Sequence, residues 1–219
     1  EISACLVGSE MCIRDRNGLI CFVDFFVLET VCEYIHNWQK HGKKFIKVSV
    51  NMSRTTLRKK NVVQKAVAIC SKYQIEPQMI EIEITESIGG LEKKLITRLM
   101  DDFHAAGFSI ALDDFGSGFS NIAALAENDF DVVKFDKSLI DTIFENDKSR
   151  TVIQQAINLC NAVNKNIETV GEGVETEQQL QILKEYGCDI GQGYLFSRPI
   201  PEEKFLKYFL TGENGEKCD

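Results

Sequence analysis

The chain has 219 residues, of which 44% are hydrophobic, so it is long enough to bury a sizeable core as one domain. Its formal net charge of -8 argues against DNA or an anionic membrane as the main partner, and no apolar run is long enough to cross a bilayer. The cysteines from Cys21 onward stand singly, without a CxxC pair or a histidine at ligand spacing, so we expect reduced thiols in a cytoplasmic protein rather than a disulfide or zinc framework.

The predicted elements begin only after residue 16. Residues 6–16 resemble one reading frame of a transposase adaptor used to prepare sequencing libraries, and the match is unbroken over LVGSEMCIRD. We interpret residues 1–16 as an adaptor-like artefact outside the fold. Asn17 is then roughly the first authentic residue, and the chain is expected to be an N-terminally truncated domain.

Helical and strand patterns alternate along the rest of the chain. Apolar residues at helical spacing from Phe25 to Trp38 predict an amphipathic helix. Strands are expected at 45–50, 80–84, 108–112, 132–135, 167–170 and 194–196, and further helices at 62–73, 92–106, 149–163 and 177–186. Gly107 and Gly187 occupy expected helix ends. This alternation predicts an α/β fold with a parallel sheet, and the regular spacing favours a closed barrel over an open sheet.

Polar side chains follow the ends of the predicted strands. In chain order they are Asn51, Glu83 with Glu86, Asp113 with Asp114, Lys134 with Asp136, Glu172 with Glu175, and Gln192. The carboxyl ends of barrel strands converge on one mouth, where the active sites of this architecture lie. We therefore expect these residues to form one site.

Four of these residues, Asn51, Glu83, Asp113 and Asp114, offer only oxygen ligands, which suit Mg²⁺ or Mn²⁺ rather than zinc or copper. Along a strand the two aspartates would point to opposite faces, so both can reach one site only where the strand gives way to the glycine-rich segment 115–118. A solvated acidic turn is the alternative interpretation of the aspartate pair. Two metal ions a few ångströms apart promote in-line displacement at phosphorus, which favours phosphodiester hydrolysis.

Lys134 is an isolated cation in the apolar run 132–135, and two interpretations of it stay open. It could orient or deprotonate the attacking water or stabilise charge on the phosphoryl group, or it could form a salt bridge within the acidic cluster. Glu86 and Glu175 could hold loops near the site rather than bind metal.

Six motifs in order resemble those of the EAL domains, a family of cyclic di-GMP phosphodiesterases. They are VNMS at 50–53, EITE at 83–86, DDFGSGFS at 113–120, KFD at 134–136, EGVET at 172–176 and QGYLF at 192–196. The resemblance implies a modified (β/α)8 barrel of the TIM type over residues 17–212, with a polar tail at 213–219. It also implies cleavage of cyclic di-GMP to linear 5'-pGpG with two Mg²⁺ or Mn²⁺ ions.

The resemblance implies a role for each motif residue. The implied metal ligands are Asn51, Glu83, Asp113 and Asp114; the implied catalytic residues are Lys134, Glu172 and Gln192; Glu86 and Glu175 would anchor loops, and Asp136 would contact substrate.

The Glu-Ala-Leu motif that names the family, on its first strand, has no match here. We therefore expect a barrel that is incomplete at its N-terminus and lacks one metal ligand, so that the complete parent is active and this fragment is weak or inactive. A non-catalytic receptor for cyclic di-GMP is the alternative, and another Mg²⁺-dependent barrel enzyme such as a lyase is supported by fold analogy alone. The resemblance also implies a homodimer through the barrel, and a sensor or diguanylate cyclase domain is possible in the parent.

Overall fold

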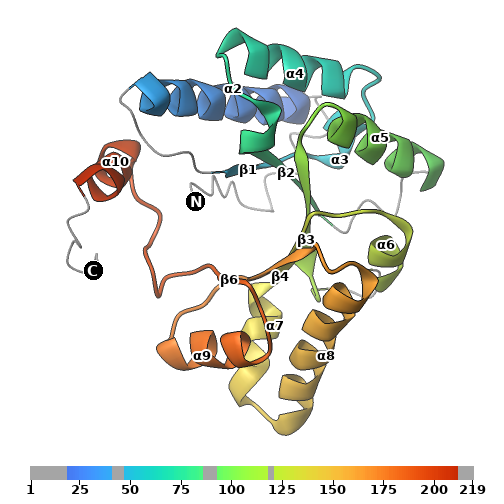
Figure 1. Cartoon of the computed structure of the whole chain (residues 1–219), viewed down its shortest axis with the longest axis vertical. Coiled ribbons are helices and arrows are strands. Elements are labelled where there is room, and N and C mark those ends of the chain that lie inside the picture. Colours follow the sequence, from blue (N-terminus) through green and yellow to red (C-terminus); the bar gives the residue numbers. More distant parts are fainter. Residues whose placement is uncertain (1–18, 41–46, 86–92, 118–120, 212–219) are drawn as a thin grey trace. The chain divides into compact units, whose positions relative to one another are not determined.

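A computed structural model of the chain describes residues 19–40, 47–85, 93–117 and 121–211. Its contacts divide the chain into two compact units, one made of Glu1–Ala111 with Glu127–Asp129 and the other of Leu112–Ala126 with Phe130–Asp219. In both units helices follow strands in alternation (Figure 1). The artefact predicted at residues 1–16 and the tail predicted at 213–219 lie outside the described residues.

The first unit contains two complete strands and four α-helices among its described residues. They are α2 (Leu19–Lys40), β1 (Val48–Asn51), α3 (Arg54–Leu57), α4 (Val62–Lys72), β2 (Ile80–Thr85) and α5 (Lys93–Ala105), with a short 3-10 turn at Pro77–Met79. The helix predicted from the apolar spacing is confirmed, because Leu28, Cys32 and Ile35 of α2 are almost fully buried. This apolar face of α2 packs against α4 (Figure 1).

Strands β1 and β2 run parallel, with Val48 opposite Ile80 and Asn51 opposite Glu83. Both strands therefore end with their polar residues at the same level. Helix α5 then ends at Ala105, two residues before Gly107, whose positive φ of 91° is a conformation that glycine adopts without strain. The expected helix end at Gly107 is confirmed, as is the one at Gly187 with a φ of 82°.

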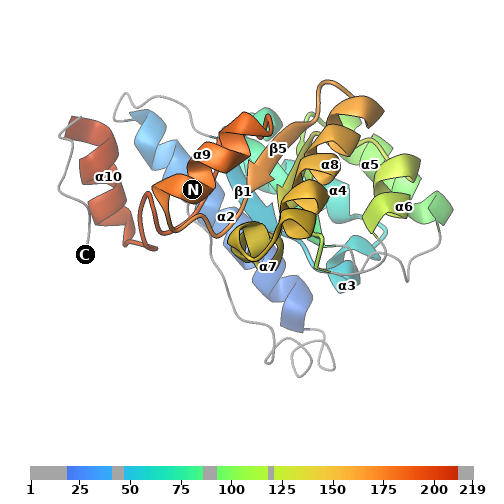
Figure 2. The same cartoon turned by 90° about the horizontal axis from the view of Figure 1, so that it is seen from below.

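Strand β3 (Ser109–Phe115) leads into the second unit. The elements that follow are α6 (Asn121–Glu127), β4 (Val132–Phe135), α7 (Lys137–Asp141), a 3-10 turn (Thr142–Phe144), α8 (Asp147–Val163), β5 (Glu168–Gly171), α9 (Glu177–Glu185), β6 (Ile190–Gly191) and α10 (Glu202–Thr211). Strand β4 pairs parallel with β5, and β5 pairs parallel with β6. Helix α7 packs against α8, as both views show (Figures 1 and 2).

The core of the second unit is built on β4, all of whose residues are buried. The Phe115 and Phe135 rings meet edge to face with centroids 5.6 Å apart, an arrangement that aromatic pairs prefer. The strands join one six-stranded sheet in chain order, β1-β2-β3-β4-β5-β6, as repeated strand–helix units produce. Among the described residues, no helix combines the length and hydropathy that a membrane span requires.

Two sequence predictions about strands are wrong. The apolar run Tyr194–Phe196 forms a turn, closed by Phe196 N–H donating to the Gly193 carbonyl at 3.1 Å, and the last strand is instead the short β6. Tyr194 and Phe196 are each 55% exposed, so these side chains do not fill the core as a strand would require. Strand β3, expected to stop at residue 112, runs on through Asp113 and Asp114 to Phe115.

Candidate active site

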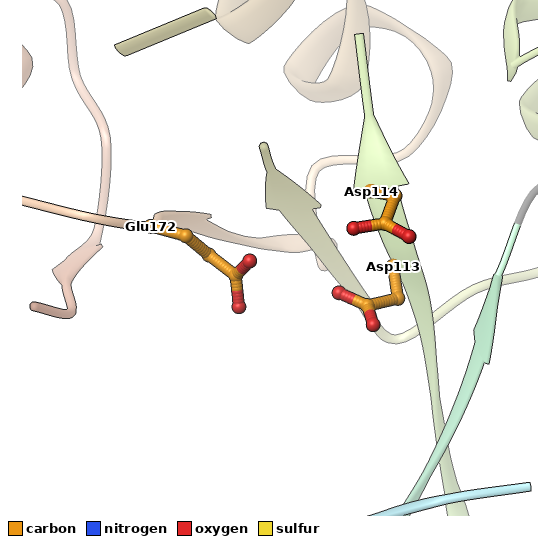
Figure 3. Close-up of side chains that lie close together, drawn as sticks. All are labelled: Asp113, Asp114 and Glu172. Atoms are coloured by element: carbon orange, nitrogen blue, oxygen red, sulfur yellow. The ribbon is translucent and has the colours of Figure 1, made fainter. Parts of the chain in front are cut away.

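Three carboxylates gather in the second unit (Figure 3). Asp113 and Asp114 lie near the end of β3, and Glu172 directly follows β5. One carboxylate oxygen of each residue lies within 4.8 Å of those of the other two, and the aspartate side chains face that of Glu172. All three residues are half-buried, so the cluster remains open to solvent.

The backbone conformation of Asp114 explains how the side chains of the adjacent residues Asp113 and Asp114 can reach the same site. Its φ is 57°, in the left-handed region, whereas regular strand geometry would send Asp113 and Asp114 to opposite faces. Aspartate tolerates this conformation better than most residues. The turn from Asp114 to Ser117 is stabilised by two hydrogen bonds. The Ser117 backbone N–H and hydroxyl both donate to the Asp114 carbonyl, at 3.1 and 2.9 Å. The sequence correctly implied that a departure from strand geometry was needed, but the departure lies within β3 rather than after it.

The cluster is electrostatically unfavourable without a cation. Burial raises the pKa of Asp114 above its usual value, and the charges of Asp113 and Asp136 raise it further, while Lys134 acts in the opposite direction. Negative charge is thus only partly compensated by this lysine. A hard divalent cation such as Mg²⁺ or Mn²⁺ fits a set of carboxylate oxygens of this kind.

Lys134 forms an ion pair with Glu172, with 2.7 Å between Nζ and Oε1. The lysine side chain is only 4% exposed and the glutamate 20%, so the pair is largely withdrawn from water. The salt bridge considered from the sequence is therefore present. Since Nζ is held beside the acidic cluster, the geometry leaves it in a position to act on a molecule bound there as well.

Asp136, expected to contact substrate, caps a helix. Its Oδ1 accepts from the Ser138 backbone N–H at 2.9 Å and from the Ser138 hydroxyl, which makes it the N-cap of α7. The cap fixes the direction in which the chain leaves β4, two residues after Lys134.

Glu175 is tied to α7 by Lys137, whose Nζ lies 2.9 Å from Glu175 Oε1 and 2.8 Å from Asp141 Oδ1. The stem of Lys137 also lies against Gly173, where an added Cβ would come within 2.3 Å of the lysine Cγ. The segment between Glu172 and Glu175 is therefore packed against α7.

Gln192 carries a buried side-chain oxygen, Oε1, that has no hydrogen-bond partner; among the described residues it is alone in this. Buried polar atoms are nearly always satisfied, so such an atom points to a bound water or ion. Its backbone joins Gln192 to the segment of Glu172, because the Gln192 N–H donates to the Gly171 carbonyl at 2.8 Å and the Val174 N–H donates to the Gln192 carbonyl at 2.9 Å.

In the first unit the structure brings Asn51 and Glu83 together. The Asn51 side-chain amide donates to Glu83 Oε2 at 2.9 Å, and Glu83 is only 4% exposed. Glu86, expected to anchor a loop, lies outside the described residues.

Two further features were not expected as parts of the site or the core. Asp24 is a buried carboxylate on α2 that binds the turn after β1, and the one signal in the sequence is a single charge within an apolar run. Cys32 and Cys70 lie with their sulfur atoms 3.9 Å apart between α2 and α4. Both thiols are free and buried, as expected of reduced cysteines, but their proximity has no signal in the spacing.

Comparison with known proteins places these features in a family. The model of the EAL domain family matches residues 11–199. The chain is 30% identical over 203 residues to the signaling protein YkoW of Bacillus subtilis, covering 93% of this chain and 25% of that protein. It is 30% identical over 200 residues to the cyclic di-GMP phosphodiesterase NbdA of Pseudomonas aeruginosa, covering 90% of this chain and 25% of that protein. The chain thus spans about a quarter of the length of these relatives.

Solved structures agree with the sequence comparison. The structure of the PaMucR phosphodiesterase in complex with c-di-GMP matches with a TM-score of 0.82 at 26% identity, over 90% of this chain and 78% of that one. The EAL domain of Mycobacterium smegmatis DcpA matches with a TM-score of 0.80 at 28% identity, over 85% of this chain and 83% of that one. These likenesses confirm the fold class expected from the sequence, the barrel of the TIM type found in EAL domains.

Proposed function

Because the chain belongs to the EAL domain family, we propose that it carries the catalytic residues of a phosphodiesterase that hydrolyses cyclic di-GMP to linear 5'-pGpG. The observation that carries the proposal is the meeting of Asp113, Asp114 and Glu172, whose oxygen atoms approach within 4.8 Å. Support for the substrate comes from relatives named as cyclic di-GMP phosphodiesterases and from the c-di-GMP complex of a structural neighbour.

The acidic cluster is proposed to hold two Mg²⁺ or Mn²⁺ ions. Asp113, Asp114 and Glu172 would supply carboxylate oxygens, and the family motifs assign Asn51 and Glu83 to the same role. Such ions, when bound, supply an activated water and offset the charge of the reacting phosphoryl group. The Asn51–Glu83 hydrogen bond of 2.9 Å keeps the amide and carboxylate of that pair in a fixed mutual orientation.

In the reaction, the water oxygen bonds to phosphorus and the bond from phosphorus to the 3' oxygen breaks, with one water proton ending on that 3' oxygen. Lys134 holds its Nζ donors beside Glu172, 2.7 Å away, where they can orient the water or stabilise the charge that develops on the phosphoryl oxygens. The unpartnered Oε1 of Gln192 accepts a hydrogen bond from water. Asp136 contributes by fixing the chain after Lys134, and direct contact with substrate remains part of the proposal.

We further propose that this domain belongs to a longer cytoplasmic signalling protein and acts as a homodimer. One relative, MucR of Pseudomonas aeruginosa, is named a bifunctional diguanylate cyclase and cyclic di-GMP phosphodiesterase, and this chain matches 29% of its length. A sensor or diguanylate cyclase domain is therefore the proposed neighbour in the parent protein, and Glu175 and Glu86 are the proposed anchors of loops at the site.

The proposal is tested by single-turnover hydrolysis with the chain in excess over cyclic di-GMP and with Mn²⁺, followed by chromatography. A parallel sample carries the first strand and helix of a complete EAL domain in place of residues 1–16. We expect 5'-pGpG in both, more slowly from the chain alone, and at least about 100-fold less after Asp113→Asn. The exposed Asp141→Asn variant is the control. Tight binding of cyclic di-GMP by both proteins with no product would favour the receptor alternative.

A further inference from the structure

Asp24 is a charged residue on the buried face of α2, 7% exposed. A single oxygen of its carboxylate, Oδ2, accepts from the Ser53 backbone N–H at 2.9 Å, the Ser53 hydroxyl at 2.6 Å and the Thr56 hydroxyl at 2.5 Å. Burying a carboxylate is costly unless hydrogen bonds compensate it, and bonds to an ionised acceptor are among the strong ones. Helix α2 is thus fixed to the start of α3 by a compensated buried charge.

These donors lie directly beyond Asn51, the last residue of β1. Ser53 is the N-cap of α3. Met52, between Asn51 and Ser53, is 3% exposed, and its N–H donates to the Glu83 carbonyl at 3.0 Å. The turn after β1 is therefore held on one side by the strand ladder and on the other by Asp24. Asn51, in contrast, is exposed, and its side-chain amide donates to Glu83 Oε2.

Helix capping alone does not account for the charge. The Ser53 hydroxyl oxygen already accepts from the Thr56 N–H at 3.3 Å, which satisfies the start of α3. What the carboxylate adds is a fixed rotamer for that hydroxyl and a fixed position for the Ser53 backbone N–H, two residues from Asn51. The direction in which Asn51 leaves the strand depends on that backbone position.

We propose that Asp24 is a positioning residue for Asn51: by holding the turn after β1 it orients the Asn51 side chain for binding a divalent cation. The inference rests on the proposed function, in which Asn51 is a metal ligand. Groups that orient a metal ligand typically change metal affinity by about 10–100-fold when they are removed. A purely structural Asp24 would change the melting temperature and leave the affinity of the folded protein unaltered.

The test compares Asp24→Ala, Asp24→Asn and the control Ile35→Ala in the whole chain. The asparagine variant keeps an acceptor oxygen, whereas the alanine variant removes it. Ile35 is 1% exposed on the same helix, about three turns further along, so its truncation loosens α2 far from the turn. Two quantities are measured on samples shown to be folded: Mn²⁺ affinity by calorimetry, and the chemical shifts of the Asn51 side-chain amide by NMR, assigned through their loss in Asn51→Asp.

We expect Asp24→Ala to weaken Mn²⁺ binding at least about tenfold and to shift the Asn51 amide signals, with Asp24→Asn recovering most of the affinity and Ile35→Ala within about twofold of wild type. Unchanged Asn51 signals in Asp24→Ala, or a loss of affinity in Ile35→Ala as large as in Asp24→Ala, would overturn the inference. Failure of the proposed function looks different, since wild type would then bind no Mn²⁺. The Asn51 signals would still decide whether Asp24 sets the orientation of that side chain.

Discussion

The two lysines near the acidic cluster make ion pairs of similar length but opposite burial, which allows a matched perturbation. Lys134 Nζ lies 2.7 Å from Glu172, with side chains 4% and 20% exposed. Lys137 Nζ lies 2.9 Å from Glu175, with side chains 47% and 49% exposed. Replacing either lysine by methionine keeps most of the aliphatic stem and removes the charge.

Lys134→Met leaves Glu172 beside Asp113 and Asp114 without the cation that compensates them. Removing one partner of a buried pair costs about 3–5 kcal/mol, and the partial exposure of Glu172 places the expected loss near the lower end, about 3 kcal/mol. For a chain of this length 1 kcal/mol corresponds to about 2–4 °C, so the melting temperature should fall by about 6–12 °C. Lys137→Met removes exposed pairs worth at most about 1 kcal/mol each.

The assay is thermal unfolding followed by circular dichroism at pH 7 in chelator, repeated with saturating Mn²⁺. The expected result is a large drop for Lys134→Met and a small one for Lys137→Met. Mn²⁺ should recover part of the drop in Lys134→Met, because a cation bound only to the folded state offsets the uncompensated carboxylates. Equal drops in melting temperature for the two variants would refute the claim that burial makes the Lys134 pair the stronger one. An increase in melting temperature with Mn²⁺ that is equal in wild type and Lys134→Met would refute the claim that the cation offsets the uncompensated carboxylates.

Other predictions concern the charge of Asp114 and the close packing of Gly193 against the backbone of Val174. The raised pKa of Asp114 means that the folded chain holds this proton more tightly than the unfolded chain, so its ionisation lowers stability as pH rises through the folded pKa. Asp114→Asn, which tolerates the positive φ, should therefore raise the melting temperature of the metal-free chain at pH 7 and have no effect near pH 2; a lower melting temperature at pH 7 would contradict this. At Gly193 an added Cβ would lie 2.3 Å from the Val174 backbone N and O, whereas at Gly187 it meets nothing within 4 Å. In chemical denaturation Gly193→Ala should cost more than the roughly 1–2 kcal/mol of left-handed strain expected for Gly187→Ala, and equal costs would contradict the packing described.

The positions of the polar residues at strand ends led us to expect one shared site, and within the second unit three of them lie close together. Asp113, Asp114 and Glu172 meet because each follows or ends a parallel strand, and strand ends share an edge of the sheet. The left-handed backbone at Asp114 could be inferred only as a need for some departure from the strand, since several local conformations would satisfy it.

Some elements could not be predicted, for physical reasons. Tyr194 to Phe196 has the composition of a strand, yet its backbone hydrogen bonds close a turn and its aromatic rings lie exposed. The short helices α3 and α7 begin directly after their capping residues, Ser53 and Asp136, which belong to motifs interpreted as parts of the site. Such helices are too short to show periodicity.

Contacts between helices that are distant in the sequence also could not be predicted. Cys32 and Cys70 are 38 positions apart, and their contact depends on how α2 packs on α4. Asp24 was visible only as a charge within an apolar run, and its partners follow a different element.

The most direct test of the central claim is the formation of 5'-pGpG from cyclic di-GMP by the whole chain in a single-turnover assay with Mn²⁺, compared with Lys134→Ala and Glu172→Gln. We expect product that requires Mn²⁺ and falls at least about 100-fold in both variants. Product formation that persists in chelator, or that survives the loss of Lys134 and Glu172, would contradict the assignment of the acidic cluster as the catalytic site.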